Sequence, residues 1–155
     1  MKVLFVCLGN TCRSPMAEAV LRQLIFKKQL TDWETDSAGL RDWNVGWLPQ
    51  GRAQDLLKQH GLKTEHMSRE ITSQDFYDFD YIFGMDDSNI QELQQIASRL
   101  QPPPTCQIQL LGSYLNRKED EIIPDPYFSR GMGGFHAAFA QILESCERFV
   151  QQHSN

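Results

Sequence analysis

A strand, a tight loop and a helix follow one another directly at the start of the chain, and this succession limits the folds open to it. Residues 3–6 form an apolar, β-branched run that is typical of a short buried strand. Ser14 is a favourable helix N-cap, and Pro15 suits the first helical position. Apolar residues then recur at helical spacing: Met16, Ala17, Val20, Leu21 and Leu24. The connecting loop has the form Cys-x5-Arg, from Cys7 to Arg13.

The composition of this loop favours the binding of an oxyanion. Successive backbone N–H groups in a tight strand-to-helix turn form a concave nest, and the helix N-terminus adds its positive dipole end. Gly9 permits unusual backbone angles, and Asn10 tolerates the left-handed region. Arg13 can hold two oxygens of a phosphate-like dianion. The same field stabilises a Cys7 thiolate, to which Ser14 can donate a hydrogen bond, so the loop predicts a nucleophile aimed at a bound phosphate.

A simpler interpretation makes Cys7 a buried, inert strand-end residue and leaves Arg13 in solvent. For the cysteine alone this interpretation would be preferred. The combination of cysteine, glycine, asparagine, arginine, serine and proline in suitable positions favours the anion loop. A nucleoside-triphosphate loop is excluded because the Gly-Lys-Ser/Thr ending is missing.

Strand and helix signals alternate through the rest of the chain. Further strands are expected near residues 33–36, 79–85 and 108–111, and further helices near 49–60, 88–97 and 135–149. Residues 71–78 predict a single helical turn, Ser37–Gly39 a turn, and Ser88 with Gln91 a capping box. Cys146 is expected in the core. Trp43 and Trp47 lie in a predicted loop, either as core plugs or as the apolar wall of a binding site.

This alternation predicts the α/β class: a single three-layer domain over residues 1–155, with a four-stranded parallel sheet flanked by helices on both faces, Rossmann-like or flavodoxin-like. Ligands of such sheets bind beyond the carboxyl ends of the strands. The first strand leads into the Cys7 loop at that edge, so position and chemistry agree.

Composition narrows the classes of function. Hydrophobic content of 41% and charged content of 23% are ordinary for a soluble globular protein. No signal peptide or membrane span is predicted, and four cysteines in 155 residues do not indicate a secreted disulfide framework, so a cytoplasmic location is expected. The net charge of −5 argues against nucleic acid as a partner. A zinc site of Cys7, Cys12 and a histidine is not favoured, because Cys-x4-Cys lacks the usual short spacing; no metal and no cofactor is predicted.

Several motifs together resemble the low-molecular-weight protein tyrosine phosphatases, nearly from end to end. The matching pieces are the segment 3–19 around Cys-Leu-Gly-Asn-Thr-Cys-Arg-Ser-Pro, Asp36-Ser-Ala-Gly, His60-Gly61, Arg69, Phe79-Asp-Tyr-Ile, Met85-Asp86, Leu110-Leu-Gly-Ser-Tyr and Asp125-Pro-Tyr. The family fold, a four-stranded parallel sheet flanked by helices, agrees with the fold predicted above.

The resemblance implies roles for particular residues. Cys7 would be the nucleophile, Arg13 the phosphate clamp and Asp125 the general acid. Trp43 and Tyr127 would form the two aromatic walls, and His66 would be structural. The remaining residues implied in phosphate or substrate binding are Leu8, Gly9, Asn10, Thr11, Cys12 and Ser14, with Asn10 as a loop brace and Ser14 as the hydroxyl partner of the thiolate.

The implied activity is hydrolysis of phosphotyrosine through a cysteinyl-phosphate intermediate, with acid-phosphatase activity on small aryl phosphates. The expected partners are phosphotyrosine-containing proteins, with phosphate or other oxyanions in the loop. The chain is expected to be a monomer, with weak self-association as the open alternative. Peroxide is expected to form a reversible disulfide between Cys7 and Cys12, because a stabilised thiolate lies near a second thiol.

Two rival functions remain at this stage. Thioredoxin-coupled arsenate reductases share the loop and a downstream Asp-Pro, but they need resolving cysteines, and residues 79–100 contain none. A non-catalytic phosphotyrosine-binding module would keep Arg13 but lose Cys7 or Asp125, and both are present.

Overall fold

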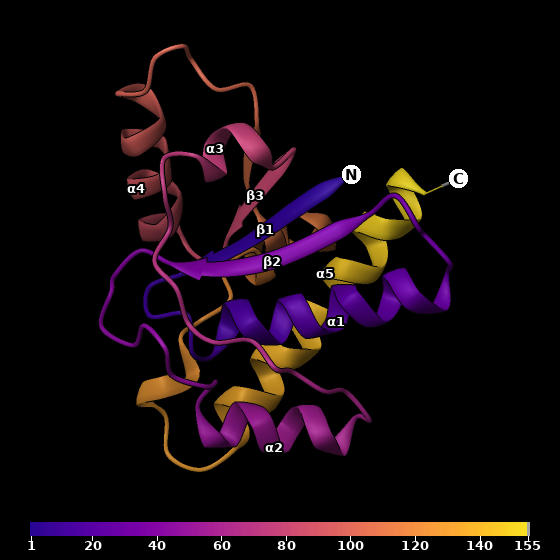
Figure 1. Cartoon of the computed structure of the whole chain (residues 1–155). Coiled ribbons are helices and arrows are strands. Elements are labelled where there is room, and N and C mark those ends of the chain that lie inside the picture. The colour runs from indigo at the N-terminus through magenta and orange to yellow at the C-terminus, as the bar shows by residue number, and fades with distance from the viewer. Residues whose placement is uncertain (155) are drawn as a thin grey trace.

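A computed structural model describes residues 1–154 of the chain (Figure 1). The strands are β1 (Lys2–Cys7), β2 (Glu34–Gly39), β3 (Tyr81–Gly84) and β4 (Gln107–Leu110). The α-helices are α1 (Arg13–Lys27), α2 (Gly51–Gln59), α3 (Asp75–Asp78), α4 (Asp87–Ser98) and α5 (Gly133–His153). Three 3₁₀ helices connect β4 to α5: η1 (Leu111–Leu115), η2 (Lys118–Asp120) and η3 (Pro126–Phe128). Among the described residues, no helix is long and apolar enough to span a membrane.

The four strands form one parallel sheet in the order β2-β1-β3-β4, which confirms the predicted fold class. The central strand β1 pairs with β2 on one side and with β3 on the other. The strand order therefore reverses next to β1, and the loop that follows Cys7 lies at this switch point. The segments that follow β2 and β3 leave the sheet at the same edge.

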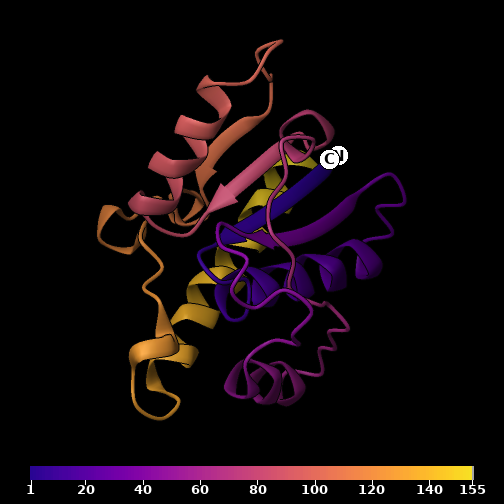
Figure 2. The same ribbon diagram turned by 60° about the vertical axis from the view of Figure 1, so that its left-hand side comes forward.

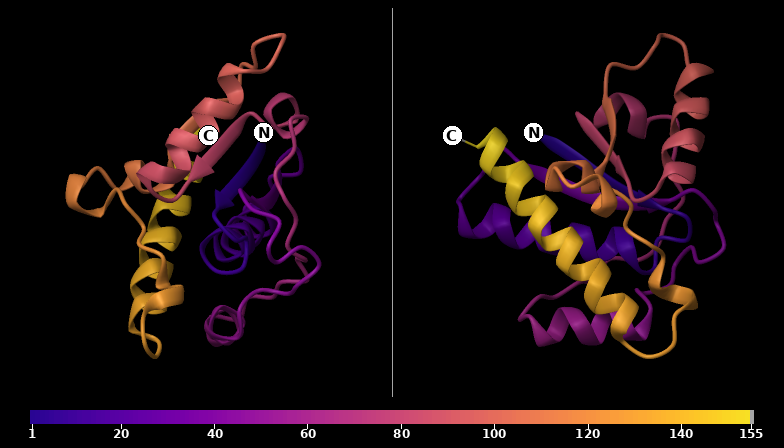
Figure 3. Two further views of the ribbon diagram at one scale, coloured as in Figure 1. Left: turned by 90° about the vertical axis from the view of Figure 1, so that its left-hand side faces the viewer. Right: turned by 180° about the vertical axis from the view of Figure 1, so that it is seen from behind.

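Helices cover both faces of the sheet (Figures 1 and 2). The first face packs on α1 and α5 through a large apolar core that includes Phe5, Phe83 and Phe149, and α2 packs against these two helices beyond the sheet. The second face packs on α3 and α4 through a smaller core around Phe76 and Leu93. Figure 3 shows α5 running the length of the first face. Because both faces are covered, β1 is apolar at nearly every position rather than alternating.

Three local predictions were wrong. Ser37–Gly39 is not a turn but the end of β2, where it pairs with Phe5–Cys7 of β1. Ser14 is not the N-cap of α1, since the helix begins at Arg13. The N-cap of α4 is Asp86, whose carboxylate accepts a hydrogen bond from the Asn89 N–H, so no capping box forms at Ser88. For Ser37–Gly39 the pairing with β1 outweighs the local propensity, whereas α4 is capped by a local bond two residues earlier than predicted.

Gly112 in η1 shows how tightly the segment before the site is packed. A Cβ atom at this position would overlap the backbone carbonyl of Glu121. Because that neighbour is backbone, it cannot rotate away as a side chain would. We expect Gly112→Ala to lower the free energy of unfolding by roughly 1–3 kcal/mol, as measured by urea denaturation.

Gly133→Ala is the matched control for this substitution. Gly133 opens α5, and a Cβ atom there would meet nothing within 4 Å. This variant should be as stable as the parent or more stable by up to about 1 kcal/mol. Equal stability of the Gly112→Ala variant and the parent would contradict the tight packing at η1.

Candidate active site

Cys7 is the last residue of β1, and its side chain opens into a cavity at the carboxyl edge of the sheet. The loop 8–12 returns the chain to α1, while the backbone N–H groups of Leu40 and Arg41 donate to the carbonyls of Cys7 and Leu8. The segment after β2 is thereby joined to the start of the loop. The Cys-x5-Arg segment thus has the strand-to-helix geometry that its sequence predicts.

The hydroxyl of Ser14 lies beside the Cys7 thiol. The two atoms Cys7 Sγ and Ser14 Oγ are 3.0 Å apart. Ser14 Oγ also accepts a hydrogen bond of 2.8 Å from the side-chain amide of Asn10. Because the oxygen accepts from Asn10, the hydroxyl hydrogen is free to point at the sulfur, which stabilises a thiolate.

Asn10 organises the loop from behind. Its φ of 56° lies in the left-handed region, as predicted from its residue type. The side-chain oxygen accepts from the Arg69 N–H at 3.0 Å and from His66 Nε2 at 2.7 Å, and the amide also donates to Ser37 Oγ at 3.0 Å. The Asn10 carbonyl accepts from the Ser68 hydroxyl at 2.6 Å. These bonds leave Asn10 almost fully buried, outside the cavity and bracing its floor.

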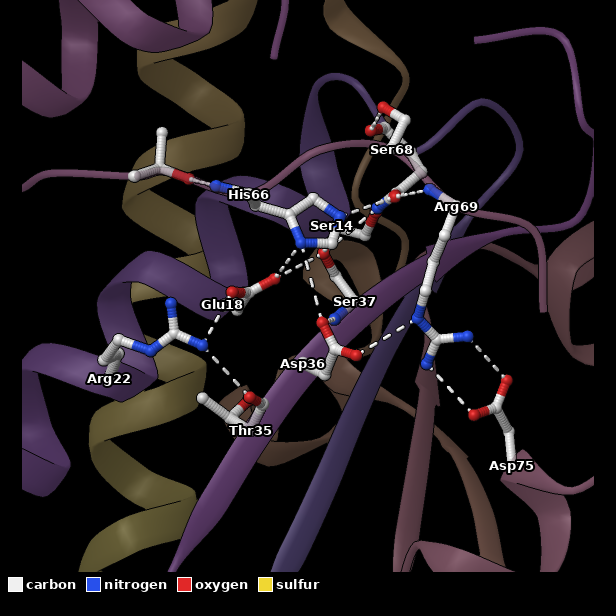
Figure 4. A network of polar contacts seen from close by, with 12 residues as sticks. Ser14, Glu18, Arg22, Thr35, Asp36, Ser37, His66, Ser68, Arg69 and Asp75 are labelled. Atoms are coloured by element: carbon white, nitrogen blue, oxygen red, sulfur yellow. Dashed lines mark hydrogen bonds and ion pairs between the residues drawn. The ribbon is translucent and has the colours of Figure 1, made fainter. Parts of the chain in front are cut away.

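A buried ionic network supports Asn10 on its far side (Figure 4). Glu18 accepts from His66 Nδ1 at 3.0 Å and from the Ser37 hydroxyl at 2.7 Å, and pairs with Arg22 at 2.8 Å. Both ring nitrogens of His66 thus face oxygen atoms, Nδ1 that of Glu18 and Nε2 that of Asn10. Burial alone would raise the pKa of Glu18, but the hydrogen bond and charge of His66 outweigh it and lower that pKa.

Ligand atoms of Glu18, Asp36 and His66 lie within 4.8 Å of one another, a spacing that could hold a metal ion. Both carboxylates are already paired with arginines, however: Glu18 with Arg22 at 2.8 Å and Asp36 with Arg69 at 3.1 Å. The carboxylates of this cluster are therefore already engaged by arginine side chains, and Arg69 also pairs with Asp75 at 3.0 Å.

Arg13 is buried at the first turn of α1. Its Nη1 atom donates to Asp86 and to the Ile123 carbonyl, each at 2.8 Å, and Nη2 lies 3.8 Å from the Asp125 carboxylate. Burial favours the neutral form of Asp86, but the hydrogen bond from Arg13 outweighs it and lowers the pKa of Asp86. Asp86 is thereby held as the ion-pair partner of Arg13.

A cavity of about 360 Å³ collects most of the predicted site residues. Its lining includes Cys7, Leu8, Gly9, Thr11, Cys12, Arg13, Trp43, Asp125 and Tyr127. Asn10 and Ser14 lie behind the loop instead. Trp47 and four residues that the sequence did not point to complete the lining, from segments 40–50 and 126–128: Asn44, Leu48, Gln50 and Phe128. The prediction left open whether Trp43 and Trp47 were core or wall; both are 63% exposed and form wall.

Two loop residues differ from expectation in their physical role. Gly9 is needed for close approach rather than for its backbone angles, because a Cβ atom there would lie 2.8 Å from the side-chain amide of Asn44. That amide donates to the Gly9 carbonyl at 3.0 Å. Burial, followed by the charge of Cys7, raises the pKa of the Cys12 thiol to about 12, so Cys12 stays protonated. Both Cys7 and Cys12 are free thiols, and a disulfide between them remains a prediction.

Comparison with known proteins identifies the family. Residues 2–154 match the low molecular weight phosphotyrosine protein phosphatase family. The chain belongs to this family. A relative with this name from Sus scrofa is 44% identical, over 97% of this chain and 94% of its own length. Another, from Drosophila melanogaster, is 42% identical, over 97% of this chain and 96% of its own length. The match favours a phosphatase over the arsenate-reductase alternative.

Solved structures agree with this assignment. A protein named drosophila arginine phosphatase is 68% identical, with a TM-score of 0.98 over 100% of this chain and 99% of its own. A protein tyrosine phosphatase from Entamoeba histolytica is 35% identical, with a TM-score of 0.89 over 98% of this chain and 96% of its own. This low-molecular-weight phosphatase is therefore a hydrolase whose family acts on phosphoproteins.

Glu18 supplies a pH-dependent part of the stability of this network. Because its pKa is lowered in the folded state, its contribution is fully present above the ordinary value of 4.5 and is lost as the pH falls through the folded value. We expect Glu18→Gln to lower the free energy of unfolding at pH 7 by roughly 1.5–3 kcal/mol, the magnitude of a hydrogen bond to a charged group. The deficit should shrink below pH 4.5, which urea unfolding at a series of pH values would measure.

Glu144→Gln is the control for this experiment. Glu144 pairs with Arg117 and Arg148 at the surface, so its loss should change stability little at any pH. A Glu18→Gln deficit that stays constant from pH 7 to below pH 4.5 would contradict the charged, buried state of Glu18.

Proposed function

We propose that this phosphatase hydrolyses phosphotyrosine in proteins through a cysteinyl-phosphate intermediate. One observation carries the proposal: Cys7, Arg13 and Asp125 line a single cavity, with the Ser14 hydroxyl 3.0 Å from the Cys7 sulfur. A nucleophile, an oxyanion clamp and a proton donor are the three groups that this reaction needs.

In the first step the Cys7 thiolate attacks phosphorus in line with the bridging oxygen. A sulfur–phosphorus bond forms, and the bond between phosphorus and the tyrosyl oxygen breaks. Asp125, protonated, gives its proton to the departing oxygen, which leaves as the phenol. Arg13 and the loop N–H groups stabilise the equatorial oxygens of a loose transition state.

In the second step a water molecule attacks the phosphorus of the intermediate. Asp125, now a carboxylate, takes a proton from that water. The sulfur–phosphorus bond breaks, inorganic phosphate leaves, and the Cys7 thiolate and the protonated Asp125 are restored. Buried Asn10 and Ser14 keep the hydrogen bond to sulfur in place throughout the cycle.

The aromatic side chains at the mouth of the cavity favour a substrate with an aromatic ring. Trp43 and Tyr127 come from opposite segments of the lining and expose 63% and 53% of their surface. Two such faces can enclose a phenyl ring. The proposal therefore includes small aryl phosphates, in an acid-phosphatase activity, and binding of phosphate or similar oxyanions by the loop. We also propose that the enzyme acts on phosphotyrosine-containing proteins in the cytoplasm and that it is a monomer with at most weak self-association.

Asp125→Ala tests the proton donor. A tyrosyl phenolate, with a conjugate-acid pKa of about 10, needs a proton to leave, whereas a nitrophenolate needs it far less. We expect the variant to lose about 10²–10⁴-fold in kcat on phosphotyrosine and much less on nitrophenyl phosphate. Steady-state kinetics on both substrates measures the difference.

Cys7→Ser is the companion variant. It should lose turnover of both substrates while still binding phosphate or vanadate, as measured by calorimetry. Retained turnover would remove Cys7 from the mechanism. A loss of the same factor on both substrates in Asp125→Ala would make that residue structural.

Phosphoarginine is a second candidate substrate. The observation that favours it is the 68% identity to a protein named drosophila arginine phosphatase, well above the identity to the relatives named phosphotyrosine phosphatases. The cavity suits this group as well, because the faces of Trp43 and Tyr127 can hold a guanidinium through cation–π contacts. Asp125 would then protonate the departing nitrogen instead of an oxygen.

Matched peptides separate the two substrates. We expect both phosphopeptides, identical except for phosphotyrosine or phosphoarginine, to be hydrolysed through Cys7, and the higher kcat/KM identifies the physiological substrate class. Turnover of the phosphoarginine peptide alone would replace the phosphotyrosine assignment, and turnover of the phosphotyrosine peptide alone would remove the second candidate.

A further inference from the structure

Arg52, on the first turn of α2, holds the segment that follows the general acid. Its guanidinium donates to three backbone carbonyls: Tyr127 at 3.0 Å, Ser129 at 2.7 Å and Gly131 at 3.0 Å. The same group lies over the ring of Phe135, 4.5 Å from its centroid. One side chain therefore joins η3, the following loop and the start of α5 to the body of the protein.

The base of Arg52 is itself tied to the phosphate loop. The N–H of Gln50 donates to the Thr11 carbonyl at 2.8 Å, and the Gln50 side chain accepts from the Arg52 N–H at 2.6 Å. The start of α2 thus sits at a fixed place relative to loop 8–12. A group held by Arg52 is held relative to the nucleophile as well.

Asp125 lies between two arginine anchors. On its upstream side, the Ile123 carbonyl accepts from Arg13 at 2.8 Å, and the Ile123 N–H donates to Met85 at 2.9 Å. On its downstream side, the Asp125 carboxylate accepts a hydrogen bond from the Tyr127 N–H at 3.0 Å. The carbonyl of Tyr127 in turn accepts a hydrogen bond from Arg52. The orientation of the carboxylate therefore depends on a turn that Arg52 keeps in place.

We propose that Arg52 is a positioning residue for the general acid, a role that rests on the function proposed for Asp125 above. Tyr127 and Phe128 are 53% and 82% exposed, so apolar packing contributes little to fixing this turn. The planar guanidinium reaches several carbonyls at once and stacks on Phe135, which an ammonium group does not do. Without it the carboxylate moves out of hydrogen-bond reach of the departing oxygen, and a displacement of about 1 Å can cost roughly 10²-fold in rate.

The test compares leaving groups. Arg52→Ala should lower kcat on phenyl phosphate by about 10–10²-fold and on nitrophenyl phosphate only a few-fold, because only the poorer leaving group needs the proton. The kcat of Arg52→Lys on phenyl phosphate should lie between that of Arg52→Ala and that of the parent. Arg148→Ala is the matched control: it too sits on a helix and donates to a backbone carbonyl of another segment, that of Leu115 at the end of η1, but away from the cavity, and its kinetics should not change. Thermal unfolding of each variant separates loss of fold from loss of positioning.

A double variant makes the inference specific. If Arg52 acts through Asp125, Arg52→Ala should cost almost nothing further on phenyl phosphate when Asp125 is already alanine. An equal loss on both substrates, or the same loss in the Asp125→Ala background as in the parent, would overturn the role of Arg52 alone. Absence of any leaving-group effect in Asp125→Ala itself would overturn the general acid, and the role of Arg52 with it.

Discussion

The left-handed backbone of Asn10 is the constraint on which the site depends. It turns loop 8–12 back on itself so that the loop can surround an anion, and it aims the Asn10 side chain into the protein rather than into the cavity. There the amide meets acceptors and donors from three segments, at Ser14, Ser37 and residues 66–69. Because Asn10 donates to the Ser14 oxygen, the hydroxyl hydrogen of Ser14 is available to the Cys7 sulfur. The reactivity proposed for Cys7 therefore begins with a residue that does not line the cavity.

Charge is organised locally in a chain whose net charge is −5. Arg13 is buried, and its Nη1 atom is engaged by Asp86 and the Ile123 carbonyl, which sets the direction of the rest of the guanidinium. Behind the loop, the Glu18 carboxylate lies 3.0 Å from His66 Nδ1 and 2.8 Å from the Arg22 guanidinium. An anion at this site is attracted by directed donors at close range, not by the field of the whole molecule. Such donors need no rearrangement when charge develops in the reaction.

The cavity has one rigid side and one exposed side. The floor is part of the sheet edge and its buried network, whereas the walls come from segment 40–50 and η3, which expose several aromatic rings. Exposed rings can accept either a phenyl ring or a guanidinium, and the same catalytic floor could serve both. Arg52 and Gln50 join these two parts, so the position of the walls and of Asp125 is set from α2.

The sequence alone determined the parallel α/β fold, the strand–loop–helix geometry from Cys7 to Arg13 and the left-handed Asn10, because each depends on burial patterns and backbone preferences within a few neighbouring residues. The resemblance to the phosphatase family led to Asp125 and the aromatic walls. Only the tertiary structure decided that Asp86 anchors Arg13, that Ser37–Gly39 is strand rather than turn, and that Arg52 holds the segment after Asp125. These partners lie between 30 and 80 residues apart in the chain. Whether they meet depends on which crossovers bring distant segments to the same edge of the sheet, and no local pattern records that.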